Sequence, residues 1–356
     1  MLKAFSMITY RQANSDDNSG LLKLAAETGM AGDIGLRIDR NPDFFSLLEM
    51  RGDSKVFVAE DRNIIIGAIC VSRQHVYIDG KIYPLQYIGD FRVSAQYRNR
   101  GIGLGLCNAM ADYVISENSD LAFLNVSKGN KKPVSFFKGR PGVPDFDNIG
   151  IFKIYQIIGK KINTKYSPYK IEETMLTDEV LDFFNCTYSK YQLGAVLTKE
   201  KFEGTRIFMV KNREAIIATM ALIDTMPFKQ NVITMLSWKL NLVLKLINVY
   251  GSLAGFSRMP GLNEPVKMLY IKYLAADISL KQLIRSLINH ARRIAYENDY
   301  AFVSLGLHEK DSLNECLNGL PKLTFKSVGM LLSIKDNRHL ITKIKEGIPF
   351  EDYSLV

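Results

Sequence analysis

The chain has 356 residues, of which 47% are hydrophobic and 23% are charged, and its formal net charge is +9. This balance is typical of globular proteins and excludes collagen-like, fully disordered and disulfide-rich classes, while the length predicts two domains. The excess of basic residues is spread over both halves and accompanies no recognition motif, so we expect no nucleic-acid partner.

The cysteines and histidines form no recognisable metal-binding or disulfide pattern. The four cysteines, at positions 70, 107, 186 and 316, include no CxxC pair, and no histidine belongs to an HExxH helix. We therefore expect no metal site, and isolated cysteines suit a reducing cytoplasm. The N-terminal apolar stretch is too short for a secretory signal, and Lys239 and Lys245 interrupt the longest apolar region. We expect a cytoplasmic protein with no membrane partner.

The first part of the chain shows a regular succession of elements. The patterns predict, in order, a strand at 7–13, helices at 17–27 and 42–50, and strands at 56–60, 64–78 and 81–93. Asp79-Gly80 is the strongest hairpin signal and predicts a type I′ turn. A long helix then begins near Gly101, followed by a buried strand at 121–126, a short helix from Pro133 and a strand at 149–158 that is expected to close the first sheet.

The strand at 81–93 alternates between apolar and polar positions. A strict alternation places five residues on one face, which we expect to be core: Leu85, Tyr87, Gly89, Phe91 and Val93. Asp90 and Arg92 lie on the other face, so that this face carries an acid and a base.

The turn after that strand has the composition of an anion-binding site. A helix that begins there leaves backbone N–H groups without partners, and its dipole adds partial positive charge. Arg98 and Arg100 add full charges, while Gly101 and Gly103 allow a ligand to approach the backbone. This combination suits a pyrophosphate.

Two nucleotide-binding motifs and one purely structural interpretation compete with this one. The dinucleotide motif G-x-G-x-x-G fails because Leu106 stands at the third glycine position, and no Walker motif G-x-x-x-x-G-K-[ST] occurs. The structural interpretation is an ordinary helix start with two solvated arginines.

The segment R-x-x-G-x-G, formed by Arg98, Gly101 and Gly103, resembles the acetyl-CoA signature of the GNAT acetyltransferase superfamily. Gly129-Asn130 after the next strand and the order of elements over 7–158 are similar to the family as well. The resemblance implies an α+β fold, with a central mixed sheet flanked by helices. It also implies acetyl-CoA as the cofactor and transfer of its acetyl group to an amine.

The resemblance also implies which residues bind acetyl-CoA. The backbone of the turn would hold the pyrophosphate, and it comprises Arg98, Asn99, Arg100, Gly101, Ile102 and Gly103. The end of the preceding strand, Phe91 to Val93, would pair with the pantetheine arm. Asn130 would line the cofactor.

Catalysis needs a base that deprotonates the acceptor amine. Many members of the family also have a tyrosine, seven residues after the asparagine, that protonates the leaving thiolate. Here Phe137 stands at that tyrosine position and has no proton to donate. Asp90 is our candidate base, because it lies on the polar face beside the expected acyl site. An ion pair with Arg92 is the structural alternative for Asp90, and Glu60 at a strand end is the second candidate base.

The polar segment 163–170, which contains Pro168, is the expected linker between a domain at 1–162 and a domain at 163–356. The second part repeats the order of elements, which suggests a divergent duplication. A helix is predicted at 178–190, strands at 207–211, 215–223 and 266–276, a helix at 280–294, a strand at 301–307 and strands near 323–334; 236–256 is expected to be helical with a break at Gly251.

The second domain resembles a degenerate copy. Its corresponding turn contains no glycine or arginine, Asp277 would repel a phosphate, and Ser279 and Gln282 predict a capping box. We therefore expect this copy to pack on the first domain and to line the acceptor cleft.

The sequence thus predicts two tandem GNAT-like domains and an acetyl-CoA-dependent N-acetyltransferase that works by direct attack of an amine. The alternative is a non-catalytic acyl-CoA-binding or regulatory protein. The acceptor and the oligomeric state stay open.

Overall fold

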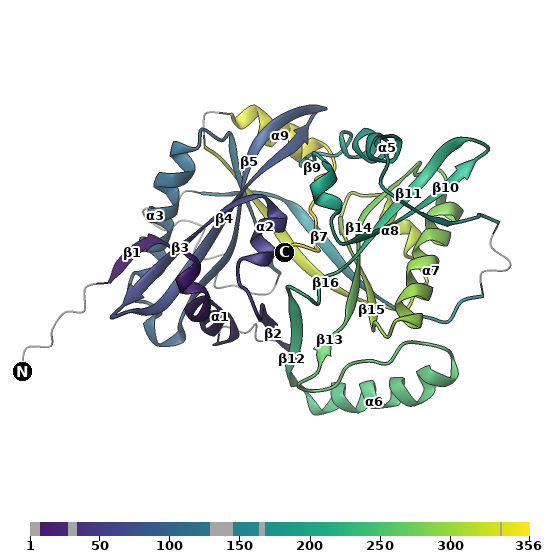
Figure 1. Ribbon diagram of the computed structural model, residues 1–356, viewed down its shortest axis with the longest axis horizontal. Helices are drawn as coiled ribbons and strands as arrows, with labels where there is room; N and C mark the ends of the chain where they lie inside the picture. Colours follow the sequence, from purple (N-terminus) through teal and green to yellow (C-terminus); the bar gives the residue numbers. More distant parts are fainter. Residues whose placement is uncertain (1–7, 28–33, 129–144, 164–167, 335–336) are drawn as a thin grey trace, which may run out of the picture.

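The computed structural model describes residues 8–27, 34–128, 145–163, 168–334 and 337–356. Its main feature is one long mixed sheet that runs through the molecule, with helices on both faces (Figure 1). Along this sheet the strands follow the order β1-β3-β4-β5-β6-β16-β7-β15-β14-β11-β10-β8. We call residues 1–162 the first half and residues 163–356 the second half.

The first half forms the predicted elements that fall within the described residues, whereas the short helix predicted from Pro133 lies outside them. Its strands are β1 (Thr9–Gln12), β2 (Ile34–Asp39), β3 (Asp53–Asp61), β4 (Ile64–Ile78), β5 (Lys81–Val93), β6 (Leu121–Ser127) and β7 (Asp147–Ile158). Its helices are η1 (Ser15–Asp17), α1 (Asn18–Glu27), α2 (Ser46–Arg51), η2 (Ala95–Tyr97) and α3 (Ile102–Ser116). Asp79 and Gly80 have φ of +52° and +73°, which confirms the type I′ hairpin between β4 and β5.

The second half repeats this pattern. Its strands are β8 (Glu172–Thr174), β9 (Gly194–Ala195), β10 (Thr205–Asn212), β11 (Ala215–Asp224), β12 (Gln230–Leu236), β13 (Pro265–Val266), β14 (Met268–Ala276), β15 (Phe302–His308) and β16 (Lys322–Ser333). Its helices are α5 (Asp178–Tyr188), η4 (Lys199–Phe202), α6 (Trp238–Leu253), α7 (Lys281–Glu297), α8 (Leu313–Cys316) and α9 (Arg338–Glu346).

The two halves exchange their closing strands. The sequence predicts that β7 closes the first sheet beside β6, and this is wrong: β16 lies beside β6, and β7 pairs with β15 and β16. The strand order is therefore nearly symmetric about the β16–β7 pair, with β1-β3-β4-β5-β6 on one side and β8-β10-β11-β14-β15 on the other. The domain boundary at residue 162 stays a prediction.

A second contact between the halves is a small three-stranded sheet. Strand β2, which the sequence analysis did not predict, pairs along its length with β12, and β12 pairs with β13. Its alternating Ile34, Leu36 and Ile38 are the signal that could have identified it. Because β2 leads into α2, this sheet fixes the start of α2 relative to the second half.

Apolar side chains fill both faces of the long sheet. In the first half, α3 covers one face through residues such as Leu106, and α1 and α2 cover the other through Leu24 and Leu48. In the second half, α7 packs through Leu283 and Leu287 on the face that it shares with β15. The halves meet through α9 and the chain around Tyr353. The apolar core thus lies in two layers, one on each face of the sheet, and it is continuous across the predicted domain boundary.

Three helix boundaries differ from the sequence-based expectations. Helix α2 begins at Ser46 and not at Pro42, because the Asp43 carboxylate accepts from Phe45 N and Ser46 Oγ and closes a turn first. Helix α6 is not broken at Gly251; it ends at Leu253, before Gly255 in the left-handed region (φ +71°).

The predicted capping box at the start of α7 is also wrong. Helix α7 begins at Lys281, and its N-terminal flanking residue is Leu280, which makes no side-chain cap. The Asp277 carboxylate accepts from Ser279 N at 2.8 Å. The side chain of Asp277, and not that of Ser279, therefore closes the turn before the helix.

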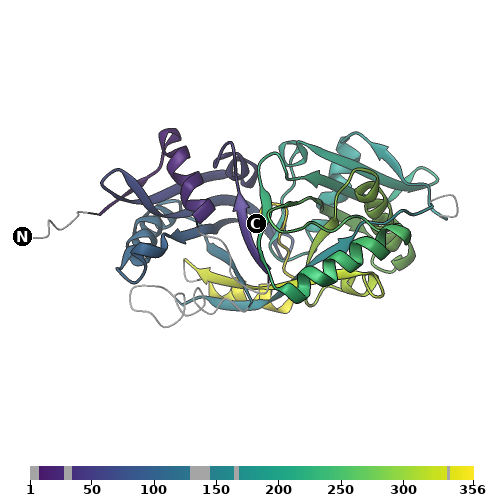
Figure 2. The same ribbon diagram turned by 90° about the horizontal axis from the view of Figure 1, so that it is seen from below.

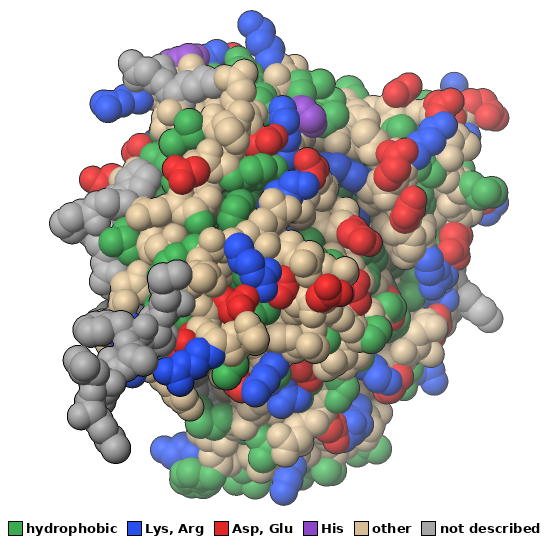
Figure 3. Space-filling model, turned by 60° about the vertical axis from the view of Figure 1, so that its left-hand side comes forward, with side chains coloured by type: hydrophobic (Ala, Val, Ile, Leu, Met, Phe, Trp, Pro, Cys, Tyr) green, Lys and Arg blue, Asp and Glu red, His purple; other side chains and the backbone are tan. Residues whose placement is uncertain are grey.

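Charged side chains are mixed over the surface. On the face drawn in Figure 3, Lys and Arg are interspersed with Asp and Glu and are not gathered into one block. No helix among the described residues is both long enough and apolar enough to cross a bilayer. No cluster of potential metal ligands occurs in the part of the chain that the structure describes.

Candidate active site

The start of α3 is an open array of backbone donors. Gly101 is the N-cap residue, with φ of +81°, and no side chain caps the helix. Among the described residues, a Cβ added at Gly101 would meet no atom within 4 Å, so the turn is open at this position. The first bond of the helix runs from Gly105 N to Gly101 O, which leaves the preceding N–H groups for an anion.

Two arginines flank this helix start and are exposed. The Arg98 Nε donates to the Val93 carbonyl oxygen at 3.2 Å, which places its guanidinium beside the end of β5. Arg100 lies over the Tyr97 ring at 5.4 Å, and Tyr97 Oη donates to Asp61 at 3.0 Å. The structure thus brings Arg98, Arg100 and Gly101 together around one turn.

Strands β5 and β6 separate beside this turn. They pair in parallel from Leu85–Leu121 to Ile88–Leu124, and no pairing follows between their remaining residues. The separation begins where β5 has a bulge, since the register against β4 shifts between Gly89 and Arg92 and Asp90 has φ of +51°. The result is a wedge between the two strands, at the N-terminus of α3.

The bulge changes which residues of β5 share a face. Leu85 and Tyr87 pack in the cluster that contains α9, whereas Phe91 and Val93 pack against the α3 cluster on the opposite face. The strict alternation predicted from the sequence is therefore wrong beyond Gly89, because the extra residue inverts the order.

Asp90 lies at the centre of a buried ion cluster. Its side chain is 6% exposed, and its carboxylate accepts from Arg40 at 2.7 Å, Arg51 at 3.0 Å and Arg92 at 3.4 Å. Burial alone would raise the pKa of the Asp90 carboxyl, but the three guanidinium groups together hold it well below its usual value. The ion pair with Arg92 that the sequence suggested is thus present, and a carboxylate so held is a weak base.

The other two predicted residues are less informative. Glu60 of β3 pairs with Arg11 of the edge strand β1 at 2.6 Å, and two strands, β4 and β5, separate it from the wedge. Asn130 lies outside the described residues, as does Phe137.

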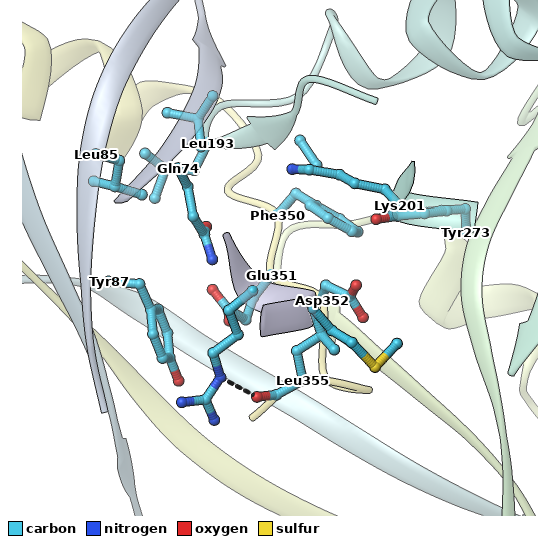
Figure 4. A pocket seen from close by; sticks show the side chains of 14 residues that line it. Gln74, Leu85, Tyr87, Leu193, Lys201, Tyr273, Phe350, Glu351, Asp352 and Leu355 are labelled. Carbon is cyan, nitrogen blue, oxygen red and sulfur yellow. Dashed lines mark hydrogen bonds between the residues drawn. The ribbon is translucent and has the colours of Figure 1, made fainter. Parts of the chain in front are cut away.

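A cavity between the two halves adjoins the ion cluster. It is lined by side chains of β4, β5, α2 and η4 and by the segment 349–355, and Figure 4 shows them converging from both sides. Tyr87 and Arg51 belong to the first half, while Lys201 and Tyr273 belong to the second. Arg51 lies 5.2 Å from the centre of the Tyr87 ring and so connects the cavity to Asp90.

The segment 349–355 reaches this cavity through fixed backbone contacts. Arg51 Nε donates to the Leu355 carbonyl oxygen at 2.6 Å, and Lys229 Nζ donates to the Ser354 carbonyl oxygen at 3.1 Å. Burial, together with Arg51 and Arg40, lowers the pKa of Lys229 to about 7. At the other end of the segment, Phe350 N donates to the Gln192 carbonyl oxygen.

Glu351 of this segment lines the cavity, and Tyr353 lies beside it against β6. Glu351 lies next to Tyr87 in the cavity (Figure 4). Burial raises the pKa of the Glu351 carboxyl well above its ordinary value, and the neighbouring Asp352 raises it further against the opposing effect of Arg51. Tyr353 Oη lies 3.3 Å from Asn125 Oδ1, on the part of β6 that borders the wedge.

The corresponding wedge of the second half is filled by protein. Strands β14 and β15 pair in parallel only from Met268–Phe302 to Tyr270–Ser304. Beyond this point Leu274 N donates to Tyr188 Oη at 2.9 Å, and the Tyr353 ring lies so close to Gly306 that an added Cβ would be 2.1 Å from it. The turn before α7 also lacks the glycines and arginines of the first half.

Sequence reasoning missed Arg40, Arg51, Glu351 and Tyr353. A signal for Arg51 exists, because it shares the buried side of α2 with Leu47 and Leu48, and a charged residue there requires a partner. No local signal identifies Glu351, since its neighbours in the cavity are distant in sequence.

The comparisons with known proteins agree with this architecture. Residues 30–140 match the model of the acetyltransferase (GNAT) family. The "Probable N-acetyltransferase HLS1-like" of Arabidopsis thaliana is 27% identical over 139 residues, which cover 35% of this chain and 34% of that protein. The match therefore spans about a third of the relative's length.

Solved structures resemble nearly the whole chain. Two structures of Saccharomyces cerevisiae N-myristoyltransferase with bound myristoyl-CoA have TM-scores of 0.63 and 0.64 at 14% and 13% identity. Each alignment covers 93% of this chain, and the alignments cover 84% and 80% of the two myristoyltransferase chains, respectively. A putative acetyltransferase from Pyrococcus horikoshii has a TM-score of 0.54 at 12% identity, with 93% of this chain and 91% of that chain covered.

The fold is thus similar to that of these solved transferases, as two tandem copies of one mixed sheet with flanking helices, which confirms the predicted fold class. The family match over residues 30–140, the curated relative and the fold together support membership of this chain in the GNAT superfamily.

Proposed function

We propose that the first half binds acyl-CoA and that the chain transfers the acyl group to an amine that enters the cavity between the halves. The observation that carries this proposal is the uncapped start of α3 beside the β5–β6 wedge, which adjoins a cavity containing Glu351. The free N–H groups at Gly101 to Gly103, with Arg98 and Arg100, fit a pyrophosphate. Asn99, Ile102 and Asn130 belong to the same proposed site.

The acyl group of the donor is the finer part of the proposal. Acetyl-CoA agrees with the family model and with the curated relative's printed name. The solved structures with bound myristoyl-CoA are those of other proteins at low identity, and they make a longer acyl chain the variable to test. The extended backbone from Phe91 to Val93, at the wedge, supports pairing with the pantetheine arm.

The chain's own residues suit direct attack by an amine. A bound acyl-CoA supplies an activated thioester carbonyl. The acceptor nitrogen attacks that carbon, the C–S bond breaks, and the proton of the nitrogen passes to the Glu351 carboxylate, directly or through water. Tyr353 Oη protonates the departing thiolate, because burial raises the pKa of Tyr353 and keeps it protonated.

In this mechanism Asp90 has a positioning role in place of the base role expected from the sequence. It binds Arg40 and Arg51, and Arg51 in turn holds the Leu355 carbonyl oxygen and stands beside Tyr87. Loss of the Asp90 carboxylate would leave three buried guanidinium groups around an uncharged side chain, which is costly.

A non-catalytic acyl-CoA-binding protein remains the second candidate function, because Phe137 replaces the tyrosine of the family pattern. Turnover with an amine separates the two functions. The cytoplasmic location expected from the sequence is likewise part of the proposal, and it is supported by four cysteines that form no disulfide.

Calorimetric titration with coenzyme A and acetyl-CoA tests the cofactor site. We expect one site per chain, and Gly103→Glu should abolish binding because it places a carboxylate at the pyrophosphate position. Ser279→Glu is the matched control, since it adds the same charge at the start of α7, and it should leave binding unchanged. Two sites per chain would contradict the filled wedge of the second half, and no binding at millimolar cofactor would overturn the proposed function.

A further inference from the structure

Helix α6 exposes an apolar stripe on its outer side. The helix lies at the lower edge of the molecule in Figure 1 and across the near side in Figure 2, outside the long sheet in both views. Large apolar side chains at a helical repeat are 48–85% exposed along it: Trp238, Leu242, Leu246, Val249, Tyr250 and Leu253. An ordinary surface helix of a globular protein is polar on this side.

The opposite side of α6 fixes the helix to the protein. Leu244 and Ile247 pack against the cluster formed by β12, β14 and β15. The Asn248 amide pairs with the Met259 backbone in both directions, at 3.0 Å and 2.7 Å. The exposed stripe is therefore held outward by fixed contacts and is not the result of a loosely attached helix.

The charges around the stripe are basic. No acidic residue occurs between Asp224 and Glu264, and Lys239 and Lys245 are exposed on α6 itself. At the end of the helix, Lys161 N donates to the Gly255 carbonyl oxygen, and Lys160 Nζ lies 4.8 Å from the centre of the Phe256 ring. Among the described residues these four lysines have no ion-pair partner.

We propose that α6 lies in the interface of an anionic lipid membrane, with its apolar stripe in the acyl boundary and its lysines at the headgroups. A helix with exposed Trp, Tyr and Leu on one side and flanking lysines matches the chemistry of interfacial helices. A second copy of the chain fits less well, because two such surfaces would bring the same lysines together. This is peripheral binding, and it differs from the expectation, drawn from the sequence, of no membrane partner.

Trp238 makes the proposal directly measurable. It is the single tryptophan of the chain and is 73% exposed, so its emission reports on α6 alone. We expect a blue shift when vesicles of phosphatidylcholine with a quarter of phosphatidylserine are added, and flotation of the protein with them. The shift should weaken as salt rises and should be small with pure phosphatidylcholine vesicles.

Variants of the stripe and of the lysines separate the two contributions. Leu246→Glu with Val249→Glu should weaken binding at least tenfold, since two large apolar side chains lose their burial. Lys239→Gln and Lys245→Gln should each weaken it about fivefold. The matched controls are Met175→Glu, an 84% exposed apolar position on another surface, and Lys211→Gln, an exposed lysine on β10, and both should bind as the unaltered protein does.

Two results would overturn the proposal. The first is a Trp238 emission unchanged by anionic vesicles, together with no flotation. The second is a blue shift that depends on protein concentration without vesicles and accompanies a dimer in analytical ultracentrifugation, which would assign the stripe to a second copy. Binding of coenzyme A, measured for each variant, is independent of α6 and shows that the variants are folded.

Discussion

Arg51 connects the two parts of the active site at the scale of single residues. One side of its guanidinium meets the Asp90 carboxylate, its Nε binds the Leu355 carbonyl oxygen, and its plane stands beside the Tyr87 ring. Because it is only 4% exposed, these contacts replace its hydration. Its position therefore depends on both the first half and the segment 349–355.

Glu351→Gln tests the proposed base. The raised pKa of Glu351 means that the carboxylate forms only as pH rises above the ordinary carboxyl range, so turnover of the unaltered protein should increase with pH through that value. The Gln variant should lose about 10²- to 10⁴-fold in kcat and should lack this rise, while coenzyme A binding stays the same. The measurement is a pH–rate profile with saturating acyl-CoA.

Asp352→Asn is the matched control for that variant, since Asp352 lines the same cavity and is adjacent in sequence. It should retain most of the activity and shift the rise to lower pH, because one carboxylate that raises the pKa of Glu351 is removed. An unaltered pH–rate profile in Glu351→Gln would assign the proton transfer to another group.

The sequence alone could indicate that the residues of the turn before α3 act together, whereas it could not indicate which residues line the cavity. Arg98, Gly101 and Gly103 lie within six positions, so local pattern suffices. Tyr87 and Glu351 meet only because the chain returns to the first half at its end. Asp90 lies where β5 separates from β6, beside the proposed acyl site, but its three arginine partners come from separate elements and determine its chemistry.

At the scale of elements, β4 packs against the start of α3, next to the turn that we propose to bind an anion. Gly67 of β4 lies under the first turn of α3, where an added Cβ would be 3.0 Å from Leu106 Cδ1 and 3.3 Å from Ile102 Cγ2. The Arg92 carbonyl oxygen of β5 would be 3.2 Å away, so a larger residue at this position crowds both the start of α3 and β5. The glycine signals a close approach that the strand pattern alone did not reveal.

Gly67→Val should push the start of α3 away from the β5–β6 wedge. We expect a loss of about 1–3 kcal/mol in the free energy of unfolding, from overpacking, and a weaker affinity for coenzyme A. Urea denaturation and calorimetry measure the two effects. Ile64→Val, at a 56% exposed position of the same strand, should change neither quantity, and full affinity in Gly67→Val would show that the turn does not depend on this contact.

The bulge in β5 illustrates why the alternation of side chains along a strand can mispredict which residues share a face. Alternation predicted one face for Tyr87 and Phe91, and one inserted residue at Asp90 separated them. Helices and hairpins with strong local signals, such as α7 and the Asp79-Gly80 turn, were predicted because their determinants are a few residues apart.

At the scale of the whole molecule, the exchange of β7 and β16 makes the halves one folding unit. Strand β6 has β16 on its free side, and β15 has β7. Neither half alone contains the strand that completes its own sheet. An unpaired strand edge would remain in each if they were separated.

Leu124→Ala should therefore destabilise both halves together. Leu124 is a buried residue of β6, and its truncation should cost about 2–5 kcal/mol. Hydrogen exchange under native conditions should show the same loss of protection in β15 (Phe302–His308) as in β6. Met175→Ala, at an exposed position, serves as the control. Protection of β15 that survives in Leu124→Ala would mean that the halves unfold independently.

The sequence by itself determined the fold class and the tandem order of elements, and it predicted the turn that we propose to bind phosphate, because each is encoded by periodicity or by residues close together in the chain. Only the tertiary structure decided which strand closes each sheet, what surrounds Asp90 and which residues line the cavity. The physical reason is that edge pairing and burial of charge depend on partners far apart in sequence. Arg51 and Asp90 illustrate this, since they are buried against each other from separate elements, and the pKa shift of each arises from that burial and that contact.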